Sequence, residues 1–140
     1  MKTPVVNWHK RLQDYSEALA ELKDYLDELK RKGFSEKLEH KIIRSFELTH
    51  EMALNTMMEY FRELGHTGIT GPRDLTVEAF HSDLIDDGET WLEMIIDRIK
   101  ASPLYNEDVN KSLMEKTSKK FINNLENFER KMKKIEEESN

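Results

Sequence analysis

The sequence contains no cysteine, only three prolines and only five glycines. Without thiols, the chain can form neither a disulfide framework nor a thiolate metal site. The chain also has 36% charged and 37% hydrophobic residues. This composition, with few helix-breaking residues, is typical of a protein built from long helices. No strand-like alternation, internal repeat or low-complexity linker is present. We therefore expect one all-α domain over residues 1–140, with a core from about 4 to 135 and a frayed tail at 136–140.

Net positive charge is also lacking, since the formal net charge is −6. This balance argues against a broad electrostatic surface for nucleic acid, so RNA binding is not expected. No uninterrupted apolar run approaches membrane-spanning length, and residues 1–20 have no apolar core like that of a signal peptide. We expect a cytoplasmic protein without membrane contact. Phosphate-loop, Rossmann and Gly-x-Ser-x-Gly patterns are absent, so no catalytic residues are assigned.

Apolar residues spaced by three and four positions predict long helices in the first half of the chain. The first helix is expected from about residue 4 to 32, with Gly33 after its last turn. Ser35 is expected to cap the second helix, which reaches about Leu64. Its apolar face is unusually wide, which indicates that it is covered on more than one side and favours a homodimer.

The second half of the chain predicts two short helices and one long one. The segment 65–72 breaks the pattern, and Pro72 suits the first position of a short helix to about Leu84. A fourth helix follows the turn at 86–88 and closes before Pro103. Asn106 can cap the last helix. Three long and two short helices predict an antiparallel up-down four-helix bundle.

One arginine does not fit its helix face. On a helical wheel, Arg98 lies in the apolar arc of the fourth helix with Trp91, whereas Glu93, Asp97 and Lys100 lie on the opposite side. A guanidinium in such a position is costly unless it is paired or hydrated. It either reaches water at the helix end, forms a structural ion pair, or faces a cleft or interface. In a cleft its planar fork can bind a carboxylate or phosphate.

The second helix supplies partners for Arg98. His50 lies within its apolar arc, Glu47 at the edge and Glu51 just outside, so packing of helices two and four would bring them together. A histidine so placed is more often a hydrogen-bonded core residue than a catalyst. Arg73 follows Gly-Pro at a helix start, near free backbone amides, and is a weak candidate for an anion site.

Glu-x-x-His spacing is typical of di-iron carboxylate sites in helical bundles. Such sites need two of these pairs on facing long helices. Here two of the three pairs lie at a helix end or on a short helix, so we expect no metal site. The three pairs are Glu47–His50, Glu63–His66 and Glu78–His81.

Three segments resemble a known family: "RSFELTHEMALNTMMEYF" (44–61), "GPRDLTVEAFHSDLIDDGETWLEMIIDR" (71–98) and "ASPLY" (101–105). They are similar to the nucleotidyltransferase substrate-binding protein family, a branch of the HEPN helical domains. The resemblance implies a homodimeric helical bundle whose partner is a separate, small nucleotidyltransferase, giving a 2:2 hetero-tetramer. It implies that this chain needs no cofactor and is not itself an enzyme. Its role would be to present a substrate, such as a nucleotide or phosphorylated ligand, in a cleft beside the partner's active site.

The same resemblance offers an alternative, because some of these helical partners are ribonuclease toxins with an Arg-x(4–6)-His motif. Arg98 matches the arginine and Tyr105 matches the tyrosine that follows the motif, but Pro103 stands where the histidine is expected. Proline cannot transfer a proton, so the general acid or base is missing. A degenerate toxin, or a bundle without any ligand, remains the alternative to a binding subunit. The candidate binding residues are Arg98, Glu47, Glu51, His50, Tyr105, Arg73 and Trp91.

Overall fold

The computed structural model describes residues 7–101 and 106–139. Within these ranges the chain forms helices joined by turns, and no strand occurs, which confirms the predicted all-helical class. A π-helical segment, η1, joins the last two helices. The helices are α1 (Trp8–Lys32), α2 (Glu36–Glu63), α3 (Gly71–His81), α4 (Gly88–Ala101), α5 (Glu107–Lys116), η1 (Thr117–Phe121) and α6 (Ile122–Glu138).

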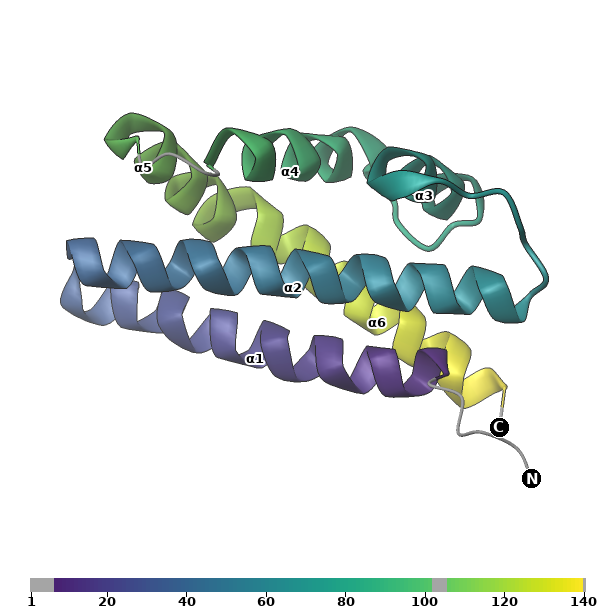
Figure 1. Ribbon diagram of the computed structural model, residues 1–140. Coiled ribbons are helices and arrows are strands. Elements are labelled where there is room, and N and C mark those ends of the chain that lie inside the picture. The colour runs from purple at the N-terminus through teal and green to yellow at the C-terminus, as the bar shows by residue number, and fades with distance from the viewer. Residues whose placement is uncertain (1–6, 102–105, 140) are drawn as a thin grey trace, which may run out of the picture.

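Helices α1 and α2 form a long antiparallel hairpin (Figure 1). Both predicted signals at its turn are confirmed. Gly33 has a φ of 80°, which favours glycine, and its N–H donates to the carbonyl of Leu29 at 2.9 Å. The Ser35 hydroxyl accepts the backbone N–H of Leu38 at 3.1 Å. Local capping chemistry therefore fixes where this hairpin turns.

Three helix ends differ from the prediction. Helix α1 begins at Trp8 rather than near residue 4, because Asn7 has an extended backbone and its side chain caps the helix. Helix α3 ends at His81 rather than at residue 84, since Asp83 adopts a left-handed φ of 61° that a helix cannot continue through. Helix α6 remains helical to Glu138, so residues 136–138 are not frayed as expected.

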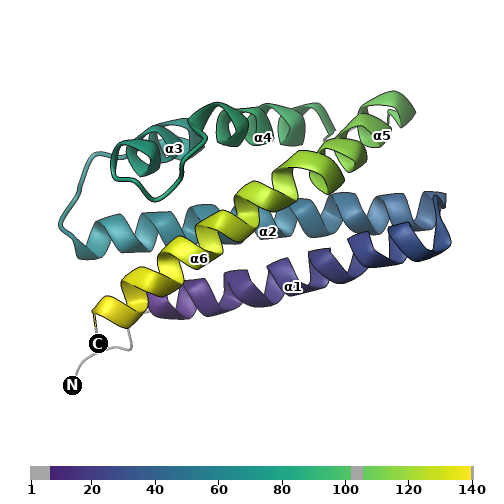
Figure 2. The same ribbon diagram turned by 180° about the vertical axis from the view of Figure 1, so that it is seen from behind.

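Helix α6 keeps its last turn because it packs at the same end of the molecule as the start of α1. His9 Nδ1 lies 2.8 Å from Glu136 Oε2, which joins residues far apart in the sequence. Figure 2 shows α5 and α6 as one continuous course that crosses α1 and α2 obliquely. The predicted last helix is thus found, but it crosses the hairpin at an angle rather than running alongside it.

The core lies where this oblique helix meets the hairpin. Phe121, at the end of the π-helical turn, stacks on Phe46 with ring centroids 5.4 Å apart. Tyr15 is fully buried and donates its hydroxyl to the carbonyl of Leu125 at 2.6 Å. Trp91 meets Phe128 edge to face. Each large side chain buried in this way contributes about 1.5–3 kcal/mol to the free energy of unfolding.

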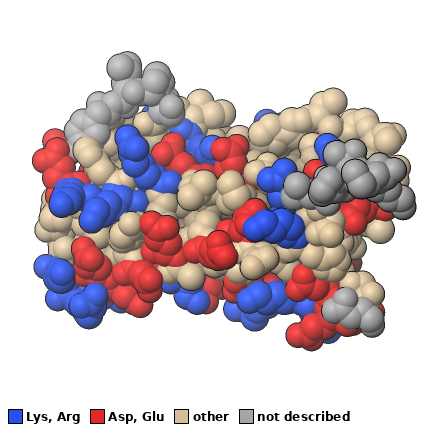
Figure 3. All heavy atoms as spheres, turned by 60° about the horizontal axis from the view of Figure 1, so that its bottom comes forward, with Lys and Arg blue, Asp and Glu red and all other residues tan. Residues whose placement is uncertain are grey.

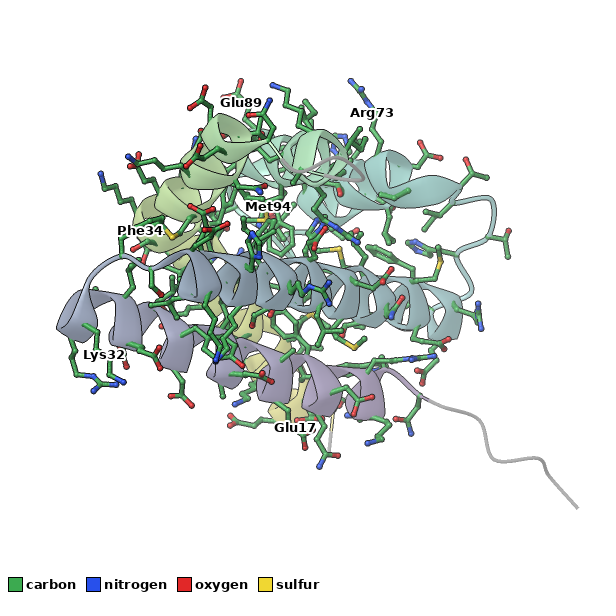
Figure 4. The ribbon with its side chains drawn as sticks, turned by 60° about the vertical axis from the view of Figure 1, so that its left-hand side comes forward. Glu17, Lys32, Phe34, Arg73, Glu89 and Met94 are labelled. Carbon is green, nitrogen blue, oxygen red and sulfur yellow. The ribbon has the colours of Figure 1, made fainter. Side chains whose placement is uncertain are left out.

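Helices α3 and α4 form a layer on the other side of α2 (Figure 1). Met94, labelled in Figure 4, lies inside the fold at 0% exposure. The predicted polar side of α4 is wrong at Asp97, which is only 6% exposed and accepts a hydrogen bond from Lys116 at 3.1 Å. Two isoleucines of the same helix, Ile96 and Ile99, are 50% and 69% exposed. A charged partner on α5 therefore rotates α4 away from the orientation that hydrophobicity alone favours.

Candidate functional site

A cleft of about 490 Å³ opens between α2, α4 and the start of α3. Its volume is within the range of small-molecule sites, which is roughly 300–1,000 Å³. Helix α2 contributes two carboxylates, an imidazole and a leucine, and α4 contributes a guanidinium between two isoleucines. The lining residues are Glu47, His50, Glu51, Leu54, Pro72, Ile95, Arg98 and Ile99.

His50 and Arg98 form the centre of this cleft. Nη1 of Arg98 lies 3.1 Å from Nδ1 of His50. Because a guanidinium only donates hydrogen bonds, Nδ1 must accept, which places the ring proton on Nε2. His50 is 1% exposed and its ring lies near those of Phe46 and Trp91, each with its centroid 6.0 Å away. Side chains of α2 and α4 therefore meet at this point, and the contact places Arg98 beside a cluster of buried aromatic rings.

Burial keeps His50 neutral. Burial and, to a smaller extent, the neighbouring charge of Arg98 together lower the pKa of His50 from 6.5 to about 3. Nε2 is buried and has no hydrogen-bond partner among the residues that the structure describes. An imidazole with this pKa, and with Nδ1 occupied, is not suited to proton transfer near neutral pH. In the structure His50 is a buried hydrogen-bond acceptor for Arg98.

Arg98 contacts an imidazole rather than the carboxylate that we expected. Neither Glu47 nor Glu51 forms an ion pair with it within 4.0 Å. The two glutamates line the same cleft, and neither forms an ion pair with another residue in the described part of the chain. The cleft therefore holds a half-buried cation fixed by a neutral group, together with two separate anions.

The other predicted site residues lie elsewhere. Trp91 is 1% exposed and does not line the cleft. Its ring lies beside that of His50, with the ring centroids 6.0 Å apart. Arg73 is exposed and points away from the body of the molecule (Figure 4), although Pro72 beside it does line the cleft. Tyr105 lies outside the described residues. The structure thus brings Arg98 together with three α2 residues, whereas Arg73 lies in the first turn of α3, as predicted, and does not line this cleft.

The list of candidate binding residues chosen from the sequence does not include the apolar walls of the cleft. Leu54 lies one turn after His50, and Ile95 and Ile99 lie three positions before and one position after Arg98. Helical spacing from the polar candidates would have found Leu54, because residues four apart share a face. It could not show that Ile99 borders a cleft rather than the core.

No group of three or more histidine, aspartate and glutamate side chains within the described ranges could hold a metal ion. The Glu-x-x-His residues serve separate contacts instead. Glu63 accepts the backbone N–H of Trp8 at 2.8 Å, and His66 lies 3.6 Å from Glu78. No helix in the described part of the chain is long and apolar enough to cross a membrane.

Surface charge is mixed rather than concentrated. Figure 3 shows basic and acidic side chains interspersed over the face on the α1 side of the molecule. Such a face offers no continuous positive stripe to a phosphate backbone. The charged groups most suited to a ligand are therefore those gathered in the cleft.

The described structure is thus an all-helical protein with an open cleft lined by a guanidinium, an imidazole and two carboxylates. The chain belongs to the family described as nucleotidyltransferase substrate binding protein like, whose model matches residues 10–134. This match confirms the family predicted from the sequence. The family is one of substrate-binding proteins rather than catalytic nucleotidyltransferases. Comparison with curated proteins found no match.

Proposed function

We propose that this chain is the non-catalytic, substrate-binding subunit of a two-component nucleotidyltransferase, of the kind in which a HEPN-like helical domain pairs with a minimal catalytic chain. One observation carries the proposal: a cleft holds the Arg98 guanidinium in place without a carboxylate counter-ion. The family description supports the association with a nucleotidyltransferase. Nucleotide and metal chemistry would belong to the partner.

The chemistry of the cleft suits binding. Arg98 has further N–H groups beyond the one directed at His50, and its planar fork matches phosphate or carboxylate oxygens. Leu54 and Ile95 offer apolar walls to the rest of a ligand. The cleft can therefore orient a substrate while another protein performs the transfer.

Exposed apolar side chains on α3 and α4 support an interface on this layer. Val77, Phe80, Ile96 and Ile99 are between 41% and 69% exposed. Clusters of exposed apolar side chains commonly mark protein–protein contacts. The wide apolar face of α2 cannot serve this purpose at Leu54 or Phe61, because the chain itself buries both. We therefore propose that the homodimer and the 2:2 assembly use the α3–α4 layer.

The test is purification of the tagged chain from its native lysate, followed by mass spectrometry. We expect recovery of a small nucleotidyltransferase. The transfer activity of the isolated complex should fall at least roughly tenfold with Arg98→Gln, a barrier change of about 1.4 kcal/mol. Arg31→Ala, at an exposed arginine in the last turn of α1, is the matched control and should leave activity unchanged.

Two results would contradict this function. Recovery of the chain alone, or with RNA, would remove the partner on which the proposal depends. Full activity of a well-folded Arg98→Gln complex would show that the cleft does not hold the substrate. Circular dichroism of each variant separates loss of binding from loss of helical structure.

A further inference from the structure

The charges that line the cleft select among ligands. Arg98 contributes one positive charge, Glu47 and Glu51 contribute two negative charges, and His50 is neutral. The lining therefore carries a formal charge of −1, within a chain whose net charge is −6. A polyanion such as a nucleoside triphosphate would meet net repulsion in this field. A ligand that brings a positive group with its negative one would not.

The two glutamates are placed to receive that positive group. Glu47 and Glu51 are four residues apart on α2, so their side chains lie on the same face, where like charges destabilise a helix. Glu47 is half-buried, and neither carboxylate has a cation within ion-pair distance among the described residues. An ammonium group between them would offset this repulsion and satisfy both carboxylates.

The arginine is placed to receive the negative group. Its contact with His50 fixes the guanidinium without neutralising it, because the imidazole carries no charge at neutral pH. The cation and the two anions thus face one cleft without pairing to each other. Leu54 and Ile95 add apolar surface to the lining of the same cleft.

We propose that the cleft binds a small zwitterion, whose ammonium group lies between Glu47 and Glu51 and whose single phosphate or carboxylate group lies on Arg98. The inference rests on the proposed function, because it names the class of substrate that the same cleft would take. It also narrows that function, since it disfavours a plain nucleotide as the molecule bound by this chain.

Binding to the purified full chain can be measured by calorimetry and by NMR shifts of the Arg98 side chain. Glucosamine 6-phosphate and leucine are the zwitterionic probes, one with a phosphate and the other with a carboxylate. Glucose 6-phosphate and 4-methylpentanoate lack the amine, whereas glucosamine and leucinamide lack the anion. ATP tests the polyanion. We expect at least one zwitterion to bind about tenfold more tightly than both of its singly charged analogues and ATP. Which zwitterion binds more tightly distinguishes phosphate from carboxylate.

Substitutions test which charged group of the ligand each side chain of the cleft binds. Glu47→Gln with Glu51→Gln should remove the preference for the amine, and Arg98→Gln should remove the preference for the anion. The matched control is Glu17→Gln with Glu21→Gln, an exposed pair with the same spacing on α1, and it should change neither preference. Figure 4 shows Glu17 pointing away from the body of the molecule.

Three outcomes would overturn the inference: no probe binds at millimolar concentration, the singly charged analogues bind as tightly as the zwitterions, or the two-glutamate variant binds anions without any loss of amine preference. If anions bind through Arg98 without amine preference and the nucleotidyltransferase is still recovered, only the zwitterion assignment fails. If Arg98→Gln changes nothing and no partner is recovered, the proposed function fails with it.

Discussion

At the residue scale, His50 links the cleft to the core. It accepts a hydrogen bond from Arg98 on one side and lies against Phe46 and Trp91 on the other. This burial has a cost that depends on pH, because the folded protein holds the imidazole neutral whereas the unfolded chain can protonate it.

The pKa of His50 is about 3 in the folded protein and 6.5 when unperturbed, so the unfolded chain binds the proton first as pH falls. The contribution of neutral His50 to the free energy of unfolding should therefore be present above pH 6.5 and decline as pH falls towards 3. Between pH 6.5 and 5 the decline should be about 2 kcal/mol. We expect the free energy of unfolding of His50→Gln to fall less over this pH range, because the variant has no imidazole to protonate. Urea unfolding of both proteins at the two pH values measures it.

Glu39 opposes this trend, since burial raises the pKa of its carboxyl group and its contribution falls as pH rises. It is present in both proteins, so the difference between them isolates His50. Equal declines in wild type and His50→Gln would show that the buried imidazole does not control acid stability.

A second prediction concerns Arg98. Its charge is the smaller of the two causes that lower the pKa of His50, after burial. Arg98→Ala should therefore raise the pKa of His50 while leaving it below 6.5, because the ring remains buried among aromatic side chains. An NMR titration of the ring protons measures the change. With the exposed Arg31→Ala as control, an unchanged His50 pKa in Arg98→Ala would contradict the observed contact.

At the element scale, a charged cluster joins α4 to α5. Lys116 lies 3.0 Å from Glu93 and 3.1 Å from Asp97, and Lys120 lies 2.6 Å from Glu93. Asp97 is the buried member, at 6% exposure. A buried carboxylate is stable only while it is paired, so this cluster fixes the rotation of α4 and with it the direction of Arg98.

Lys116→Met should destabilise the protein by about 1–2 kcal/mol, less than breaking a fully buried pair because Lys116 is partly exposed. Adding Asp97→Asn should recover part of the loss, since no buried charge is then left unpaired. Chemical unfolding of the single and double variants gives the coupling free energy between Lys116 and Asp97. Lys10→Met, which breaks an exposed pair with Asp14, is the control and should have no measurable effect. Purely additive losses would show that Lys116 does not support Asp97.

At the scale of the whole molecule, the α3–α4 layer presents the apolar side chains proposed to form the dimer. Val77→Glu with Ile96→Glu should shift the protein from dimer to monomer in sedimentation velocity at micromolar concentration, because a charge in a desolvated contact is costly. Both side chains are substantially exposed, so the melting temperature should change little. Phe34→Glu, at a 60% exposed position beside the α1–α2 turn (Figure 4), is the control and should leave the dimer intact. Sedimentation of the wild-type protein as a monomer would contradict the proposed homodimer.

The sequence alone determined the features that depend on neighbours along the chain. The helical class, the caps at Ser35 and Asn106 and the stop at Gly33 follow from local hydrogen bonding and backbone preference. Helical periodicity also marked His50 and Arg98 as polar residues on otherwise apolar faces. These signals act over three or four residues and need no knowledge of the rest of the fold.

Only the tertiary structure decided which partners those residues meet. Periodicity could not show that Arg98 bonds to an imidazole rather than to Glu47, because that choice depends on the depth at which α4 lies on α2. Nor could it bury Asp97, whose partner Lys116 lies 19 residues away. Contacts between helices depend on how whole faces pack, and a buried charge settles the rotation of a helix against its hydrophobic preference.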